Sequence, residues 1–392
     1  MSDIVIVSAK RTPIGSFLGQ FSGISAPSLG AVAIRAALEQ ARVEGAEVSE
    51  IMMGCVLPAN LGQAPARQAA IAGGIPPSAS CTTVNKVCGS GMKTIMLGHD
   101  LIKAGAAAIT VAGGMESMSN APHMIPNSRG GNRYGNFEVV DHMAWDGLTN
   151  PYDGQAMGHF GECTAERYGF TREQQDAFAV ESLTRALAAQ ADGGFAAEIA
   201  PVPVTTRGGG VTFDCDEEPG RGSIDKIPSL RTVFRRDNGT ITAASSSGIS
   251  DGAAAVVLMS AAEAERRGLT PLARVVAHAT HAQEPAWFTT APVGAIAKLL
   301  QRTGWRVDDV DLFEINEAFA VVAMAAMHDH AIPHAKVNVH GGACALGHPI
   351  GASGARIVVT LLHALTARAA RRGIATLCIG GGEATAIALE RL

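Results

Sequence analysis

Short apolar stretches alternate with longer amphipathic ones in the first third of the chain. Residues 4–8, 50–56 and 108–112 are compact apolar runs that predict buried strands, and helices are predicted over 28–43 and 64–72. Strands that are apolar throughout are typical of sheets covered on both faces. The pattern therefore favours an α/β fold built on a largely parallel sheet.

The same alternation returns after Leu272. Strands are predicted over 272–277, 311–315, 336–340 and 376–379, and helices over 295–303, 318–328 and 351–371. In each half a buried strand is followed by Gly-Gly-x-Glu, which ends at Glu116 in the first half and at Glu383 in the second. We interpret the halves as duplicates of one another and the two glutamates as structural equivalents.

The middle of the chain has a different amino-acid composition, rich in Gly, Pro, Asn and charged side chains. One helix pair is predicted there, over 158–169 and 171–191. Thr171 and Gln174 have the spacing of a capping box and mark the start of the second helix.

This change of composition predicts the domain organisation. We predict a first half at 1–116 that is completed by about 250–268, an inserted lobe at 117–249, and a second half at 269–392. Lobes of this length cover an active site or bind the tail of a ligand.

Composition narrows the class of protein. The 392 residues are 47% hydrophobic, enough for two cores or one large duplicated core. The net charge of -5 gives no sign of a nucleic-acid or membrane surface, and no apolar run reaches the length of a membrane span. The first strand begins at Ile4, which leaves no room for a targeting peptide, so we expect a cytoplasmic protein. Seven cysteines without a C-x-x-C pair argue against a disulfide framework and a structural zinc site.

Cys88 lies between a β-prone run at 81–84 and an apolar helical run at 92–102. This order places its thiol near a helix N-terminus, where the helix dipole and free N–H groups favour a thiolate and an oxyanion. We expect Gly89 and Gly91 to let the backbone turn sharply and a ligand approach. Taken alone, Cys88 would be one more buried cysteine.

Three later stretches combine glycine-rich turns with reactive groups. Asn316 follows a predicted strand and opens a helix, His348 lies in the glycine-rich loop 341–354, and Cys378 precedes three glycines. Each has an ordinary interpretation when it is taken alone: a helix N-cap, a hydrogen-bonded loop histidine and a core cysteine.

With these motifs together, the chain resembles the thiolases over essentially its whole length. The motifs at 85–92, 316–320, 348–354 and 378–382 occur in the order and spacing of that family. The resemblance implies the thiolase fold, two duplicated α/β halves in a five-layered αβαβα arrangement with an inserted loop domain. It also implies reversible condensation of two acetyl-CoA to acetoacetyl-CoA, or thiolysis of a 3-ketoacyl-CoA, through an acyl-Cys88 intermediate.

The resemblance assigns a role to each motif residue. Cys88 is the expected nucleophile, His348 its activating base, and Cys378 a second acid/base that moves the α-proton. Asn316 is expected to hold a water that forms one oxyanion hole with His348. The backbone N–H groups of Cys88 and Gly380 form the other.

Coenzyme A is expected to bind as a substrate, through acetyl-CoA and related thioesters, with no permanent cofactor and no metal. The resemblance assigns pantetheine contacts to Leu148, Met157, Ser247, Ala318 and Phe319, and an adenosine-phosphate contact to Arg221. Because members of the family are dimers or tetramers, a homotetramer is expected.

The chain departs from many short-chain relatives around the expected acyl pocket. Ala156 stands where many of them carry His, and Phe288, Thr289 and Ala291 replace a Met and glycines. If these three line the pocket, their bulk narrows it and favours acetoacetyl-CoA. A longer-chain 3-ketoacyl-CoA thiolase stays open as the alternative.

Three other functions compete with this one. A ketoacyl synthase shares the fold but lacks the second cysteine, so Cys378 argues against it. A non-catalytic acyl-CoA-binding module has no need of Cys88 or His348, and both are present. A redox sensor that pairs Cys88 with Cys378 is compatible with catalysis.

Overall fold

The computed structural model describes residues 3–206 and 209–392 and contains one large sheet made of two repeated parts. The first part has the order β4-β3-β5-β10-β1, with β3 parallel to both of its neighbours and β10 antiparallel to both of its own. Its strands are β1 (Ile4–Arg11), β3 (Glu50–Gly54), β4 (Ser80–Val84), β5 (Ile109–Ser117) and β10 (Ser250–Ser260), and the short β2 (Gly15–Ser16) pairs with β10.

The second part repeats this pattern. Its order is β12-β13-β14-β11, with β12 parallel to β13 and the other neighbours antiparallel. Its strands are β11 (Ala273–Ala282), β12 (Leu312–Ile315), β13 (Arg372–Ile379) and β14 (Glu383–Arg391). Two residue pairs between β1 and β11 join the parts. The matching orders confirm the predicted duplication.

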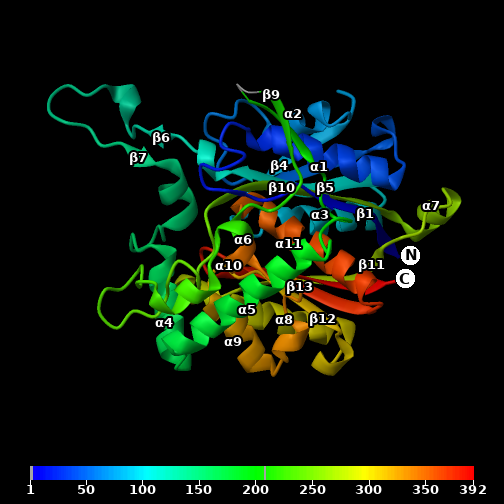
Figure 1. Ribbon diagram of the computed structural model, residues 1–392. Helices are drawn as coiled ribbons and strands as arrows, with labels where there is room; N and C mark the ends of the chain where they lie inside the picture. The colour runs from blue at the N-terminus through cyan, green and yellow to red at the C-terminus, as the bar shows by residue number, and fades with distance from the viewer. Residues whose placement is uncertain (1–2, 207–208) are drawn as a thin grey trace.

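Helices cover the sheet in three layers (Figure 1). α1 (Ala26–Ala41) and α2 (Pro65–Ala72) lie on the outer face of the first part, and α8 (Ala291–Thr303) and α9 (Ala320–His330) on that of the second. α3 (Ser90–Lys103) and α11 (Ile350–Ala367) lie between the two parts. The predicted five-layered αβαβα arrangement is thereby confirmed.

Alternate residues of β1 show why the strands are apolar throughout. Val5 and Val7 pack into the outer core with α1 and α2, whereas Ile4 and Ile6 pack into the middle core with α3 and α11. Successive side chains of a strand point to opposite faces, so a sheet with helices on both sides needs apolar residues at every position.

The middle helices cross where neither has a side chain. A Cβ added to Gly354 of α11 would lie 2.4 Å from the backbone N of Met92, and one added to Gly91 of α3 would lie 2.8 Å from the N of Ala355. Within the described residues, α11 is the one helix long and apolar enough to cross a membrane, and most of it is buried in this middle layer. The expectation that no apolar run reaches that length was therefore wrong.

The predicted insert lies between the end of β5 and the start of β10. Its helices α4 (Met157–Tyr168) and α5 (Arg172–Ala191) pack beside the second half, and the capping box at the start of α5 is formed as predicted. The shorter elements are β6 (His123–Met124), β7 (Val140–Asp141), the π-helix Met143–Leu148, β8 (Val202–Thr206), β9 (Gly209–Phe213) and α6 (Glu218–Arg221). The β6–β7 hairpin belongs to an arm that projects from the body (Figure 1).

A buried ion cluster fastens the insert to β1. The Arg11 side chain is fully buried, and its guanidinium lies 2.5 Å from Glu198 Oε1 and 2.7 Å from Asp216 Oδ1. Although burial lowers the pKa of Arg11, the two carboxylates raise it further than burial lowers it. The arginine is therefore charged, and its partners compensate for the lost hydration.

The equivalence of Glu116 and Glu383 was wrong, although the duplication that it suggested is real. β5 continues through Gly113 and Gly114 to Ser117, whereas β13 ends before its glycines and Glu383 opens β14. A Cβ on Gly114 would lie 2.0 Å from the Gly351 carbonyl oxygen. The first glycine pair serves close packing inside a strand, and the second makes a turn.

Candidate active site

Cys88 sits in a tight loop two residues before α3 begins. Val87 has a φ of 46°, in the left-handed region that β-branched residues rarely adopt. Its N–H donates to Asn85 Oδ1 at 2.9 Å, and its carbonyl accepts from Ser90 Oγ at 2.7 Å. Ser90 Oγ also accepts from the N–H of Lys86 at 2.8 Å. These bonds hold a strained turn that fixes the direction of the Cys88 side chain.

The glycines beside Cys88 have a different purpose from the expected one. Gly89 has a φ of -79°, which any residue adopts, so the turn does not depend on it. A Cβ at Gly89 would lie 2.3 Å from Ile379 Cδ1. Gly89 and Gly91 therefore allow β13 and α11 to approach, and Val87 makes the turn.

The Cys88 thiol is partly buried and receives two backbone hydrogen bonds. Burial raises its pKa to about 11, although the N–H groups of Gly380 and of Cys88 itself act in the opposite direction. The thiol thus keeps its proton near neutral pH, and its activation requires a base. The same two N–H groups are the donors expected for the acyl oxyanion.

His348 is held in an orientation that suits a base. Its Nδ1 lies 2.6 Å from Ser353 Oγ, and that hydroxyl donates to the Pro349 carbonyl at 2.9 Å. The hydroxyl therefore accepts from Nδ1–H, which leaves Nε2 without a proton. Nε2 is buried and has no hydrogen-bond partner among the described residues. Burial, with the nearby Arg356 charge, lowers the pKa of His348 to about 3, so the imidazole is neutral at rest.

Glu116 anchors the loop around His348 and was not predicted to do so. Its carboxylate accepts from the N–H groups of Gly351 at 2.9 Å, Val56 at 2.9 Å and Leu57 at 3.2 Å. Burial raises its pKa to about 7 in spite of these three bonds. The signal in the sequence was a carboxylate at the end of an apolar strand.

Asn316 lies fully inside the protein beside a buried arginine. Its Oδ1 accepts from Arg356 Nη2 at 3.3 Å, and within residues 3–206 and 209–392 its Nδ2 has no partner. Arg356 also contacts Glu314 of β12 at 3.5 Å. The sequence signal for Arg356 was a charged residue in the middle of an otherwise apolar helix.

Cys378 lies next to Cys88 although 290 positions separate them in the sequence. It is fully buried in β13 and packs in one cluster with Phe288, Ala318 and Phe319. Burial raises the pKa of the Cys378 thiol, and the charge of an ionised Cys88 raises it further. The Cys378 thiol therefore keeps its proton at rest, and ionisation of Cys88 strengthens that preference.

The expected pantetheine residues meet at an apolar cavity of about 290 Å³ whose wall includes His348. They are Leu148, Met157, Ser247, Ala318 and Phe319. The N–H and Oγ of Ser247 both donate to the Ala318 carbonyl, at 3.0 and 3.1 Å. These two bonds join two walls of the cavity. A wider cavity of about 630 Å³ shares Met157 and reaches Gly380.

Arg221 does not belong to either cavity. It lies on the short helix α6, where its side chain is 56% exposed and pairs with Glu217 at 3.5 Å. The geometry therefore gives no support to Arg221 as a phosphate contact.

The residues expected to narrow the acyl pocket lie in different places. Phe288 packs in the cluster of Cys378. Thr289 points its hydroxyl to Thr164 Oγ1 at 2.5 Å, and Ala291 packs into the outer core of the second half. Of the three, the structure brings only Phe288 into the side-chain cluster of the site.

This geometry first defines a class: an α/β protein of two repeated halves in which two thiols pack against the wall of an apolar cavity that a neutral imidazole also lines. The family models "Thiolase, N-terminal domain" and "Thiolase, C-terminal domain" match residues 4–262 and 269–391. The chain belongs to the thiolase family.

Individual relatives agree with this assignment. The chain is 51% identical to an acetyl-CoA acetyltransferase of Cupriavidus necator, with all of both chains covered. It is 48% identical to a mitochondrial acetyl-CoA acetyltransferase of Bos taurus, over all of this chain and 92% of that protein. A thiolase from Ascaris suum, crystallised in complex with coenzyme A, superimposes with a TM-score of 0.94 at 44% identity over the whole of both chains.

Proposed function

We propose that this protein is an acetyl-CoA acetyltransferase, which cleaves acetoacetyl-CoA with CoA or forms it from two acetyl-CoA. The observation that carries the proposal is a cavity lined by His348 and by the expected pantetheine residues, with Cys88 and Cys378 packed against residues of its wall. The relatives with this activity, at about half identity over the full chain, support it.

The resting protonation states fit the first half of thiolysis. His348 Nε2 takes the proton of Cys88, and the thiolate attacks the 3-keto carbon of the substrate. The bond between that carbon and the α-carbon then breaks, and the departing α-carbon takes the proton of Cys378. The products of this half are acetyl-CoA, an acyl-Cys88 thioester, an imidazolium and a Cys378 thiolate.

The second half returns every proton. The Cys378 thiolate takes the thiol proton of the incoming CoA, and the CoA sulfur attacks the acyl carbon. Cys88 leaves and recovers its proton from His348. The N–H groups of Cys88 and Gly380 donate to the acyl oxyanion, and the buried Nδ2 of Asn316 can hold a water against the enolate oxygen. Condensation is the reverse sequence.

Two variants test this division of labour. Transfer of a proton to or from the α-carbon requires Cys378 as the acid or base. The CoA thiol, with a pKa of about 8.5, can exchange its proton with water instead. In Cys378→Ala, acetylation of Cys88 by acetyl-CoA should therefore survive while acetoacetyl-CoA formation falls by roughly 10²–10⁴-fold. Cys88→Ala should lose both steps, and Cys344→Ala serves as the matched control that keeps both.

The assays are incorporation of labelled acetyl groups, located by peptide mass, and acetoacetyl-CoA formation or cleavage. Near-normal condensation by Cys378→Ala, or acetyl groups on another cysteine with Cys88 untouched, would refute the proposed roles.

A cytoplasmic homotetramer completes the proposal. All seven cysteines are free, as is usual in a reducing compartment. The arm around β6 and β7 carries Tyr134 and Phe137 with exposed aromatic rings, which suits a contact between subunits. Light scattering on the purified protein would give the subunit number, and cell fractionation would give the location.

A further inference from the structure

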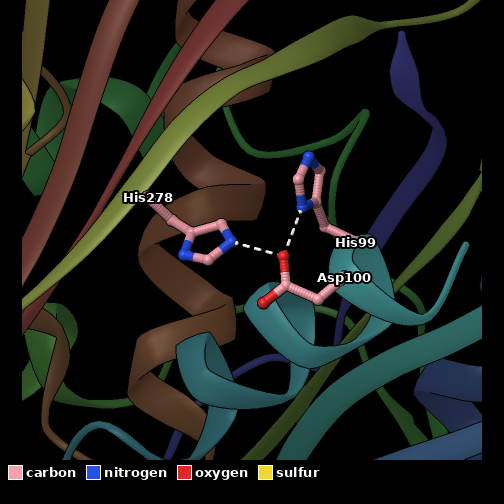
Figure 2. A group of neighbouring side chains, drawn as sticks. All are labelled: His99, Asp100 and His278. Carbon is pink, nitrogen blue, oxygen red and sulfur yellow. Dashed lines mark hydrogen bonds and ion pairs between the residues drawn. The ribbon is translucent and has the colours of Figure 1, made fainter. Parts of the chain in front are cut away.

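Three potential metal ligands meet where the end of α3 approaches β11 (Figure 2). His99 and Asp100 lie near the end of α3, and His278 lies on β11. Asp100 Oδ1 is 2.9 Å from both His99 Nδ1 and His278 Nε2. The two imidazole rings meet edge to face with centroids 5.1 Å apart. The cluster therefore converges on one point from two elements of different halves.

The separations suit a single ion. The three ligand atoms lie within 4.8 Å of one another, and two of the three separations are 2.9 Å. Because zinc sits about 2.0–2.2 Å from nitrogen and oxygen ligands, small side-chain rotations would place all three at bonding distance. Two imidazoles and one carboxylate suit zinc, nickel or cobalt better than magnesium or calcium.

The two histidines of the cluster are largely buried, whereas its aspartate is exposed to solvent. The side chains of His99 and His278 are 8% and 16% exposed, so their rings are held by packing, whereas Asp100 is 53% exposed. An ion can therefore enter from the Asp100 side and keep water in its remaining positions.

The charges around the cluster are mixed. Asp100 supplies the one carboxylate of the three ligands, which offsets half of the charge of a divalent ion. Lys103 and Arg274 line the adjacent cavity with His99 and are nearby cations that a bound ion must tolerate.

We propose that His99, Asp100 and His278 bind a divalent transition-metal ion of the zinc, nickel or cobalt class. The ion fastens the middle helix of the first half to the sheet of the second. His99 follows Cys88 by eleven residues, which places it about 16 Å along the helix axis from the reactive thiol. The site is therefore structural and separate from the chemistry of the thioester.

Titration of the metal-free enzyme with nickel chloride at neutral pH tests the site. We expect one equivalent to bind and to raise Tm, because a ligand of the native state stabilises it. His99→Ala and His278→Ala should each weaken binding at least tenfold. His328→Ala is the matched control, since His328 and Asp329 form the same adjacent pair at 2.9 Å and no third ligand joins them among the described residues. This variant should bind as the wild type does.

Cobalt(II) absorption separates this site from the cysteines. Imidazole and carboxylate ligands give weak visible bands, whereas thiolates add intense near-ultraviolet charge-transfer bands. Asp100→Asn, which keeps the size of the side chain, replaces any histidine variant that does not fold and should also lose affinity. Absence of binding, wild-type affinity in the folded variants, or thiolate bands that persist in them would overturn the proposal.

Discussion

The crossing of α3 and α11 makes Gly354→Ala a sharp test of how the fold positions the site. A Cβ at this position would lie 2.4 Å from the Met92 backbone N, whereas ordinary contacts begin at 3.4 Å. The obstacle is backbone of α3 at a buried position, so no side-chain rotation relieves it. The helices must separate by about 1 Å, since overpacked cores respond by backbone shifts.

The consequence reaches the reaction because these helices carry its groups. Cys88 lies at the start of α3, and His348 lies just before α11. A displacement of about 1 Å costs on the order of 10²-fold in rate, so kcat/KM should fall by about that factor. Overpacking should also lower the free energy of unfolding by about 1–3 kcal/mol.

Thiolysis of acetoacetyl-CoA and urea denaturation measure the two effects. Gly220→Ala is the control, because a Cβ at that helical glycine has no atom within 4 Å, and it should be neutral or slightly stabilising. A Gly354→Ala enzyme with wild-type stability and kcat/KM would refute the argument that this contact sets the distance between the catalytic segments.

Three further predictions concern other contacts. Arg11→Met leaves two carboxylates buried without their cation and should lower the free energy of unfolding by about 3–5 kcal/mol in urea titrations; a loss below about 1 kcal/mol would contradict this. Ser353→Ala removes the acceptor of the His348 Nδ1–H, so kcat/KM should fall about 5- to 100-fold with an unchanged fold, and unaltered kinetics would show that the hydroxyl does not orient the ring. Because Phe288 packs in the cluster of Cys378, the enzyme should prefer acetoacetyl-CoA to a C8 substrate. Phe288→Ala should raise kcat/KM for the C8 substrate relative to kcat/KM for acetoacetyl-CoA. A wild-type kcat/KM on the C8 substrate equal to or above that on acetoacetyl-CoA would refute the role of this ring.

The sequence predicted the duplication correctly, but the two motifs used for that prediction are not structurally equivalent. Two Gly-Gly-x-Glu motifs suggested equivalent strand ends, yet Gly113 and Gly114 lie inside β5 while Gly381 and Gly382 have positive φ in the turn after β13. A glycine that avoids a clash and a glycine that makes a turn are identical in a sequence. What distinguishes them is the atom that a Cβ would meet.

The alternation of strands and helices could be predicted because it depends on local apolar patterns, and the motifs around Cys88, Asn316, His348 and Cys378 could be found because each belongs to one local turn. Their meeting could not be derived from those patterns, and came only from the resemblance to the thiolases. Val87 shows the limit at short range, since its left-handed conformation is imposed by hydrogen bonds rather than by its own preference.

By itself, the sequence determined which residues stand at the ends of which strands and helices, since hydrophobic period, caps and glycines act over a few positions. Only the tertiary structure decided the protonation of the site: Cys88 and His348 are each neutral because packing shields both from water. It also decided that His278 meets Asp100 across 178 positions. Desolvation and proximity depend on every segment that covers a group, and no local pattern contains that information.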